Sequence, residues 1–448
     1  MENRKFITEP ARDVKVCGQV DLCVVGGSCT GLFAAVRAAR LGLRVLVVEM
    51  DNCLGGVATS GLVNVWHKLT DEDEQKQVIA GLTQEVLDRL NKVGAVAVSD
   101  DPKRLARYEL NTEELKIELD RLAGEQGIEL FFHTLYCAPI LDGDRLTGIV
   151  VENKDGRQAI LADFFIDASG DGDLARDAGL ASFQYAHIQP PSPCYRMIGD
   201  GEGISISRLI QEHGAEFGLL DDWGWDCRVP GLPQVMFRAD THVFGCACQR
   251  AKDLSLAEVE GRRQVRAVMD ILRKYAGDRD FRLISLFSHL GIRDSVHYES
   301  VYQITGEELM AGTAYPDTVA QGTYPIDVHH SDNAGITYRY LGGYEYVHND
   351  RCSPPQVNHW RTDGDYARYY QVPFRTLVQD KVRNLIPVGR MLNADASAFG
   401  AVRVMVNLNQ LGEAAGTAAY LCLQRDCPVW QAEGTEVRRL LAQGGSAL

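Results

Sequence analysis

Short apolar runs and helically spaced apolar residues alternate near the start of the chain. Residues 22–25 form one apolar run, and residues 45–48 form a second. Between them, apolar side chains recur at three and four positions, which predicts a helix with a buried face. Because two short apolar runs flank this helix, we predict a strand–helix–strand unit with parallel strands across residues 21–50.

The turn that leads into this helix is made of small residues. It reads Gly26-Gly27-Ser28-Cys29-Thr30-Gly31. In such a unit the turn presents free backbone N–H groups at the helix N-terminus, where they bind the pyrophosphate of a dinucleotide. Glu49 ends the second strand, at the interval expected for a carboxylate that binds an adenosine ribose. Ser28 takes the place of the motif's second glycine, and we interpret it as a variant whose hydroxyl can donate to a phosphate.

Strands with tight turns follow in the next part of the chain. Residues 128–166 have the alternating pattern of strands, with hairpin turns at residues 142–144 and 154–156. The last of these strands leads into the small-residue turn 167–173. Glycines in that turn allow the backbone to lie close to a ligand.

Three further helices are predicted from periodicity and from end signals. They lie at residues 78–94, 111–127 and 255–276. The first ends in a glycine, and the second begins at Asn111 with Glu114 three residues later. The third begins with Ser255 and Glu258, which also have the spacing of a capping box.

The pattern divides the chain into two predicted domains. The dinucleotide-binding pattern is absent from residues 179–371, which hold most of the tryptophans, histidines and prolines. We predict an inserted substrate domain of mixed strands and helices there. After residue 371 the strand-and-helix pattern of the first part of the chain returns, with a buried strand near residue 385 and a helix that opens at about Gly400. The fold class is therefore α/β, with one domain built from residues 1–178 and 372–448.

Composition narrows the range of partners. The 448 residues have a net charge of −15, which disfavours binding to nucleic acid or to an anionic membrane surface. No apolar run reaches the roughly 18 residues that span a bilayer, and the first residues lack a secretory signal, so we expect a cytoplasmic protein. The 12 cysteines are expected to stay reduced. Their spacing predicts neither an iron–sulfur cluster nor a metal site.

Several glycine-bearing segments, in this order, resemble those of FAD-dependent oxidoreductases with a glutathione-reductase-like fold. The branch concerned continues with a Gly-Gly-x-Ala-Thr-x-Gly loop, which here is residues 55–61. Its later signatures correspond to residues 166–174, Gly291-Ile292-Arg293, residues 324–329, and Gly389-Arg390 followed by Arg403-Val404-Met405. The resemblance covers nearly the whole chain.

The resemblance implies a Rossmann-type FAD-binding domain made from both ends of the chain, with the substrate domain inserted between them. It places the ADP half of FAD on residues 20–50 and 163–173, and the flavin ring at loop 55–61. It also implies that the helix opening at Arg403 points its N-terminus at the flavin, where it would stabilise negative charge. The implied cofactor contacts are Gly26, Gly27, Ser28, Cys29, Thr30, Gly31, Glu49, Met50, Gly55, Gly56, Val57, Ala58, Thr59, Gly170, Asp171, Gly389, Arg390, Arg403 and Met405. The middle of the chain contains no second glycine fingerprint, so a separate NAD(P)H domain is not expected.

Candidate catalytic residues come from the predicted substrate domain and from the end of the flavin loop. His329 follows Asp327 by two positions, so both point to one face of a strand, and the aspartate can raise the basicity of the imidazole or fix its tautomer. Arg293 lies in an apolar passage and needs an anionic partner, either a protein carboxylate such as Asp294 or a substrate or flavin anion. His67 follows the flavin loop. A structural role is the alternative for each of these residues.

We therefore predict a dehydrogenase or oxidase that transfers a hydride from a small alcohol, amine or sugar-like substrate to FAD. His329 or His67 would be the base, and Arg293 would anchor the substrate or the flavin. Two alternatives are an NAD(P)H-dependent flavin monooxygenase and a flavin electron-transfer subunit of a complex. The sequence leaves open whether the chain forms a homo-oligomer.

Overall fold

A parallel sheet lies at the centre of the computed structural model, which describes residues 7–99, 107–199, 201, 203–220, 224–331, 335–349 and 355–448. Its strand order is β6-β2-β1-β9-β8-β7, and β22 pairs with β9. These strands are β1 (Lys15–Val25), β2 (Val45–Val48), β6 (Glu129–Phe131), β7 (Leu135–Asp142), β8 (Arg145–Asn153), β9 (Gly156–Asp167) and β22 (Leu385–Pro387). Strands β6, β2, β1, β9 and β22 are parallel, whereas β7, β8 and β9 form the antiparallel meander that the hairpin turns predict. Segments from both ends of the chain thus share one sheet.

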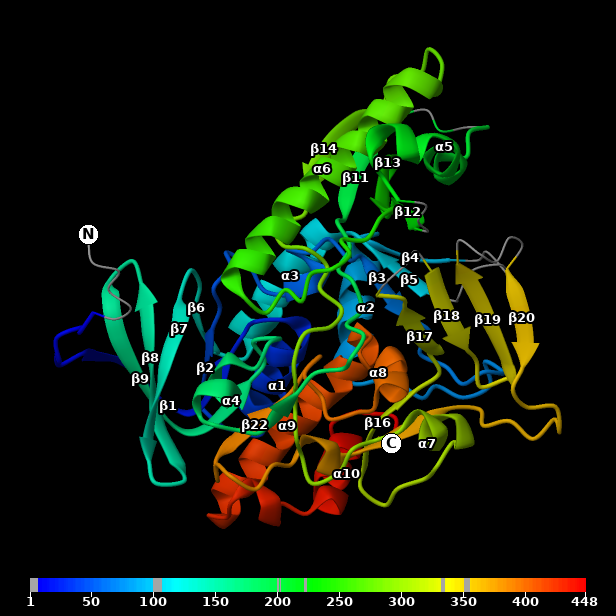
Figure 1. The fold of residues 1–448 in the computed structure, drawn as a ribbon. Helices are drawn as coiled ribbons and strands as arrows, with labels where there is room; N and C mark the ends of the chain where they lie inside the picture. Colours follow the sequence, from blue (N-terminus) through cyan, green and yellow to red (C-terminus); the bar gives the residue numbers. More distant parts are fainter. Residues whose placement is uncertain are drawn as a thin grey trace.

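Two helices that are far apart in sequence pack directly on each other beside this sheet. Helix α1 (Cys29–Arg40) is buried over most of its length, and α9 (Met405–Arg425) lies alongside it (Figure 1). A Cβ atom on Gly412 would lie 2.2 Å from the carbonyl oxygen of Thr30, and one on Gly416 would lie 2.1 Å from that of Ala34. The two backbones are therefore in contact along the face of α9 that carries Gly412 and Gly416.

The remaining helices complete the layers around the sheets. Their bounds are α2 (Leu82–Lys92), α3 (Thr112–Glu125), α4 (Asp173–Asp177), α5 (Ile206–His213), α6 (Ala251–Tyr275), α7 (Gly306–Ala311), α8 (Ala396–Val402) and α10 (Gly434–Gln443). In the described residues no helix is long and apolar enough to cross a membrane.

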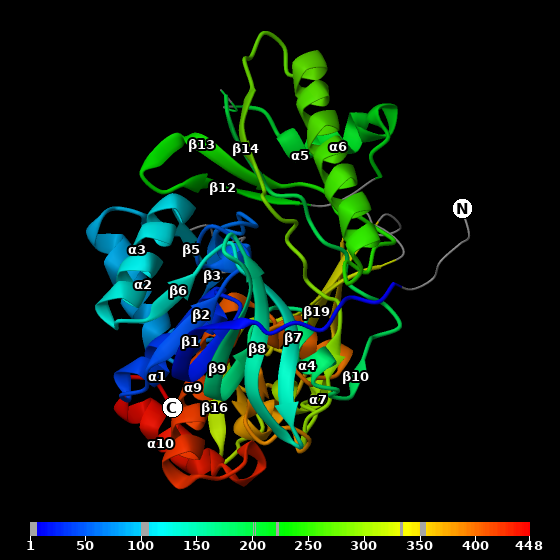
Figure 2. The same cartoon turned by 90° about the vertical axis from the view of Figure 1, so that its left-hand side faces the viewer.

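Smaller sheets surround the parallel sheet. Their strands are β3 (Val65–His67), β4 (Val96–Val98) and β5 (Arg107–Leu110); β10 (Ser182–Phe183) and β15 (His297–Tyr298); β11 (Tyr195–Ile198), β12 (Trp225–Val229), β13 (Leu232–Ala239) and β14 (Arg282–Leu286); β16 (Thr318–Gly322) and β21 (Tyr370–Pro373); and β17 (Ile326–His329), β18 (Gly335–Arg339), β19 (Tyr344–Asn349) and β20 (Gln356–His359). In Figures 1 and 2 the β11–β14 sheet and α6 project together from one end of the molecule. Sheet β17–β20 forms a separate flank.

Two predicted helix starts are wrong, for a local reason in each case. Helix α6 begins at Ala251, so Ser255 lies inside it and its hydroxyl donates to the carbonyl of Ala251 at 2.6 Å. Glu258 accepts a hydrogen bond from the distant Leu290 N–H at 2.9 Å instead of closing a capping box. Gly400 lies within α8, whose start is set by the N-cap Asp395, and α9 begins separately at Met405.

The other two predicted helices are present with shifted ends. Helix α2 begins at Leu82, four residues after the predicted start, and ends two residues before its predicted glycine. Asn111 caps α3, with its side-chain oxygen accepting from the N–H of Glu113 at 3.1 Å. The sequence therefore identified the cap of α3 correctly.

Candidate functional site

The turn between β1 and α1 requires its glycines. Gly26 has φ +100°, and a Cβ atom there would lie 2.4 Å from the carbonyl oxygen of Ala168 in the turn after β9. A Cβ atom on Gly31 would lie 2.0 Å from the carbonyl oxygen of Gly26. Ser28 is the N-cap of α1 and accepts a hydrogen bond from Gly31 N–H at 3.3 Å. The described first turn of α1 contains no acidic side chain, so its positive N-terminal end is available to an anion.

Glu49 lies at the end of β2, as predicted, but its carboxylate already has partners within the chain. One oxygen accepts from Gly27 N–H at 2.6 Å and the other from Asp51 N–H at 2.8 Å. The side chain is only 7% exposed, and this burial raises the pKa of Glu49. Because each carboxylate oxygen has two lone pairs, the group retains capacity to accept from a ribose hydroxyl.

The second glycine loop lies against the first turn. Gly55 N–H donates to Gly27 O at 2.8 Å, and Ser28 and Gly55 form a parallel β-bridge. The loop continues into the 3₁₀ turn Gly56–Ala58, where Gly55 and Gly56 both have positive φ. Thr59 closes it by donating its hydroxyl to the carbonyl of Leu54 at 2.7 Å. Residues 26–31 and 55–61 therefore form one continuous surface, a pairing that the sequence did not reveal.

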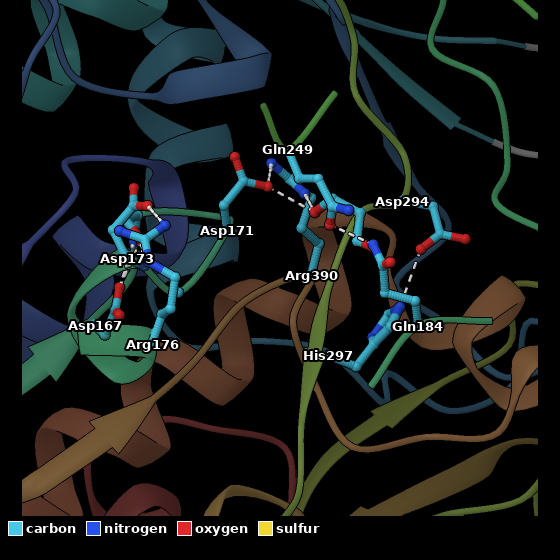
Figure 3. Close-up of polar contacts among 12 residues, drawn as sticks. Asp167, Asp171, Asp173, Arg176, Gln184, Gln249, Asp294, His297 and Arg390 are labelled. Atoms are coloured by element: carbon cyan, nitrogen blue, oxygen red, sulfur yellow. Dashed lines mark hydrogen bonds and ion pairs between the residues drawn. The ribbon is translucent and has the colours of Figure 1, made fainter. Parts of the chain in front are cut away.

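The third and fourth glycine segments meet at an ion pair. Arg390 Nη2 lies 2.7 Å from Asp171 Oδ1, and the Ser295 hydroxyl donates to the same oxygen at 2.6 Å (Figure 3). Gly170 and Gly389 precede these residues with φ +91° and +128°, and a Cβ atom on Gly389 would meet open space. We call the surface formed by residues 26–31, 55–61, 167–173 and 389–390 the glycine cradle.

A buried aspartate fixes the shape of the turn after β9. Asp167 accepts hydrogen bonds from Ser169 N–H at 3.0 Å, from the Ser169 hydroxyl at 2.7 Å and from Ala175 N–H at 2.8 Å. It is fully buried. Figure 3 shows this carboxylate beside α4, separate from the Asp171–Arg390 pair. The hydrogen bonds of Asp167 therefore fix the shape of the turn, while Asp171 pairs with Arg390.

The predicted catalytic residues Asp327 and His329 lie together at β17. His329 Nε2 is 3.4 Å from Asp327 Oδ1, so the two share a strand face as their spacing predicts. Asp327 also accepts from the Tyr324 hydroxyl at 2.6 Å and lies 3.2 Å from Arg403 Nη2. Both side chains are largely buried, at 3% and 9% exposure. We call Arg293, Asp327, His329 and Arg403 the arginine–histidine cluster.

The expectation that Asp327 raises the basicity of His329 is wrong. Burial and the positive charge of Arg293, followed by His242 and Arg403, lower the pKa of His329 well below 6.5. These effects outweigh the single carboxylate, because Asp327 also faces Arg403. His329 is therefore a neutral imidazole at neutral pH, and its Nε2 lies near the aspartate without a hydrogen bond to it.

Arg293 has no carboxylate within 4 Å among the residues that the structure describes. Its Nη1 donates to the carbonyl of Pro190 and to the Ser192 hydroxyl, both at 2.9 Å. Asp294, the protein partner considered from the sequence, instead accepts from Gln189 N–H at 3.1 Å and lies 3.0 Å from His297 Nε2 (Figure 3). Burial and the charge of Arg403 lower the pKa of Arg293. The guanidinium therefore lacks an ionic partner in the described chain.

His67 packs at the edge of the arginine–histidine cluster. Its ring lies 4.0 Å from that of Tyr324, centroid to centroid. Burial, with smaller contributions from Arg107 and Arg403, lowers its pKa to about 3. His67 and His329 are therefore both neutral at physiological pH, and the geometry brings only His329 against a carboxylate.

Sequence reasoning missed two residues that complete the cluster. The Gln189 side-chain oxygen accepts from His329 N–H at 3.1 Å and from Arg403 Nη2 at 3.2 Å. The His242 ring lies 4.7 Å from that of His329 and lines a cavity of about 250 Å³ beside α6. Neither residue lies in a motif, so only the tertiary fold identifies them. Tyr324 did carry a signal, since it begins the signature at residues 324–329.

Short contacts join the glycine cradle to the arginine–histidine cluster. Ser288 N–H donates to the carbonyl of Ser60 at 2.8 Å, which links loop 55–61 to the segment that leads to Arg293. His289 Nε2 lies 2.6 Å from Asp51 Oδ1, in the loop after β2. Arg403 links the arginine–histidine cluster to α9, because it lies two residues before this helix and contacts Asp327. The described residues contain no group of three metal-ligating side chains.

We expect His289→Gln to remove a small, pH-dependent contribution to stability. The hydrogen bond to Asp51 raises the pKa of His289, so the contribution is complete below a histidine's ordinary pKa of about 6.5 and is lost as the pH rises through the raised value. Burial alone would raise the pKa of Asp51, but His289 holds it below its ordinary value, so the contribution is also lost in strong acid. Solvent screens this half-exposed pair, and we therefore expect a loss of about 0.5 kcal/mol at about pH 5.5 and almost none at about pH 9.

Urea unfolding of the wild type and of His289→Gln at both pH values measures this difference. Equal losses at the two pH values would show that the charge of His289 does not stabilise the contact with Asp51.

Comparison with known proteins gives one match across most of the chain. Residues 21–441 match the family model described as FAD dependent oxidoreductase. Digeranylgeranylglycerophospholipid reductase 2 of Methanothermobacter thermautotrophicus is 30% identical over 168 residues, 36% of this chain and 42% of that protein. The probable electron transfer flavoprotein-ubiquinone oxidoreductase of Saccharomyces cerevisiae mitochondria is 28% identical over 151 residues, 29% of this chain and 23% of that protein. The matches span less than half the length of these curated relatives.

A solved structure with a similar fold is that of a geranylgeranyl bacteriochlorophyll reductase-like protein from Thermoplasma acidophilum. It aligns with 95% of this chain and 84% of its own, with 13% sequence identity and a TM-score of 0.47.

Proposed function

Because the chain belongs to the FAD-dependent oxidoreductase family, we propose that it oxidises a small organic substrate by hydride transfer to FAD. Because this family consists of FAD-dependent oxidoreductases, the chain is an enzyme with FAD as its cofactor. What we propose beyond the family is that the substrate is a small organic molecule and that its hydride passes to FAD. The arginine–histidine cluster supports both parts of this proposal.

The residues of the glycine cradle fit FAD. At Gly26 and Gly31 a side chain would collide with backbone atoms of this chain, so the turn can keep this compact shape only with glycine. The N-terminus of α1 offers N–H donors and a positive dipole end to a pyrophosphate. Glu49 retains acceptor capacity for a ribose. The donor set thus matches an adenine dinucleotide.

We propose that FAD runs across the cradle in the glutathione-reductase-like arrangement. The ADP half would lie on residues 26–31 with Glu49, and Asp171 with Arg390 would bind the middle of the cofactor. The flavin would lie between loop 55–61 and the start of α9 near Arg403 and Met405. This arrangement corresponds to a cofactor domain of residues 1–178 and 372–448 and a substrate domain of residues 179–371.

We propose that His329 is the base. We assign the imidazole proton to Nε2, which lies 3.4 Å from Asp327 Oδ1, so that Nδ1 would carry the lone pair and accept the proton from the substrate oxygen or nitrogen. Arg293 would anchor the substrate, and the burial of the cluster would exclude water. Bound FAD supplies the acceptor for the two electrons of the hydride. The observation that carries this proposal is that the carboxylate of Asp327 lies both 3.4 Å from His329 Nε2 and 3.2 Å from Arg403, which stands two residues before α9.

The first test is whether the purified chain carries FAD. We expect a yellow protein, and we expect Gly31→Ala to bind FAD at least tenfold more weakly, because a Cβ atom would lie 2.0 Å from Gly26 O. Flavin absorbance after gel filtration, together with a titration of the FAD-free protein, measures both.

Gly124→Ala is the matched control. Gly124 lies within α3, and a Cβ atom there would meet no other atom within 4 Å, so FAD binding should be unchanged. A folded wild type that takes up no FAD in excess cofactor would contradict the proposed function.

A further inference from the structure

We propose that the arginine–histidine cluster binds the carboxylate of an organic acid between Arg293 and Arg403, so that the substrate is a monocarboxylate oxidised at a carbon close to its acid group. This inference rests on the proposed function and specifies its substrate class.

The first observation is the incomplete set of contacts made by Arg293. Among the residues that the structure describes, its guanidinium donates through Nη1 alone, to Pro190 O and to the Ser192 hydroxyl. These two neutral acceptors fix one nitrogen and leave the rest of the planar fork for a ligand. A guanidinium fork pairs with a carboxylate through two parallel hydrogen bonds. Arg293 therefore has the form of an anchored but unpaired anion receptor.

The second observation is that Arg403 is also only partly satisfied. Its Nη2 contacts Asp327 Oδ2 at 3.2 Å and Gln189 Oε1 at 3.2 Å. Its Nε is buried and has no hydrogen-bond partner in the described part of the chain. A buried donor without an acceptor is costly, and an incoming acceptor would remove that cost.

The third observation is the charge of the cluster as a whole. The cluster contains two guanidinium groups but one carboxylate, Asp327, which pairs with Arg403. His329 and His67 have lowered pKa values and contribute no charge at neutral pH. The described cluster therefore holds about one unbalanced positive charge in a largely buried setting, where an unpaired ion is unfavourable. A single negative charge would balance it, which favours a monocarboxylate over a phosphate dianion.

The fourth observation concerns the position of the base. Arg403 Nη2 and His329 Nε2 lie against the same carboxylate, Asp327, at 3.2 and 3.4 Å, and Gln189 Oε1 accepts from Arg403 Nη2 and from the backbone N–H of His329. An acid group bound by Arg403 and Arg293 would therefore bring its neighbouring carbon atoms toward the imidazole. A hydroxyl or amino group on such a carbon could lose its proton to Nδ1 while its C–H hydride passes to bound FAD, leaving a keto or imino acid.

The experiment uses the holoprotein and two simple acids with their neutral analogues. Acetate and benzoate are titrated beside acetamide and benzamide, and binding is followed by the flavin difference spectrum and by the midpoint of thermal unfolding. We expect each acid to bind at least tenfold more tightly than its amide. Arg293→Met should weaken the binding of both acids about 30-fold, because a charge-assisted bidentate contact is lost.

Two variants keep the result interpretable. Arg293→Lys retains the charge but not the fork, so its acid affinity should fall between those of the wild type and Arg293→Met. Arg266→Met removes an exposed arginine of α6 that pairs with Asp270, and it should leave acid binding unchanged. Thermal midpoints of the two Arg293 variants without acid show whether they fold.

The outcomes separate this inference from the proposed function. A yellow protein that binds acids no better than amides, or that binds phosphate more tightly than acetate, would overturn the carboxylate site while the flavoenzyme stands. Unchanged acid binding in Arg293→Met, together with weaker addition of sulfite to the flavin, would also overturn it and assign Arg293 to the reduced cofactor. A colourless protein whose thermal midpoint still rises with acids would support the site and contradict the proposed function.

Discussion

Replacing His329 with alanine should lower the rate constant of flavin reduction about 1,000-fold. General bases contribute about 10²- to 10⁴-fold, and His329 is the buried neutral imidazole that faces a carboxylate in the cluster. The lowered pKa of His329 adds a second expectation. The imidazole stays unprotonated down to a pH well below 6.5, so the wild-type rate constant should not fall between about pH 8 and about pH 6.5.

Anaerobic stopped-flow mixing with a substrate that bleaches the flavin measures this rate constant. Such a substrate can be found with a panel of hydroxy acids, amino acids, alcohols and sugars. His67→Ala tests the other candidate base and should change the rate constant much less. His359→Ala, on the exposed edge strand β20, should leave it unchanged. A loss of less than tenfold in His329→Ala would remove this residue from the mechanism.

Replacing Glu413 with alanine should destabilise the fold by about 3–5 kcal/mol, because it leaves a buried guanidinium without its counter-ion. Glu413 of α9 pairs with Arg37 of α1, and the two side chains are 1% and 5% exposed. The carboxylate also accepts from Leu82 N–H at 3.0 Å, at the start of α2. Burial raises the pKa of Glu413, and the charge and hydrogen bond of Arg37 oppose this. One carboxylate therefore ties three helices together.

Chemical unfolding of the variant beside the wild type measures the loss. Glu212→Ala breaks the exposed pair with Arg208 and should cost less than about 0.5 kcal/mol. The double variant Arg37→Met, Glu413→Leu should recover most of the stability, since a buried ion pair can be replaced by apolar side chains at little cost. A loss below about 1 kcal/mol in Glu413→Ala would mean that Arg37 finds another partner or reaches water.

The strands and turns around the glycine cradle could be predicted from the sequence, because the sequence signals for them are local. The turn at residues 26–31, the acid Glu49 and the hairpin turns of β7–β9 each depend on neighbours a few positions away. The structure places them as expected in a parallel α/β core. Helix ends were less accessible, because Ser255 and Glu258 satisfy a capping pattern while Glu258 binds the distant Leu290.

The arginine–histidine cluster was harder to predict from the sequence, because it depends on contacts between distant segments. Gln189 binds Arg403, 214 positions away in the sequence, and His242 meets His329 only through tertiary packing. The spacing of Asp327 and His329 predicted their contact but not its effect on the pKa, which depends on Arg293 and on burial. The missing partner of Arg293 is likewise a property of the fold, since the adjacent Asp294 points elsewhere.

The pairing of β22 with β9 and the packing of α9 on α1 have a consequence for the protein's biosynthesis. During translation, the glycine turn at residues 26–31 is synthesised long before β22, which joins the same sheet, and before α9. Contacts of such large sequence separation form late in folding. We therefore expect FAD to bind only after α9 has been synthesised, because until then α1 lacks the helix that packs against it.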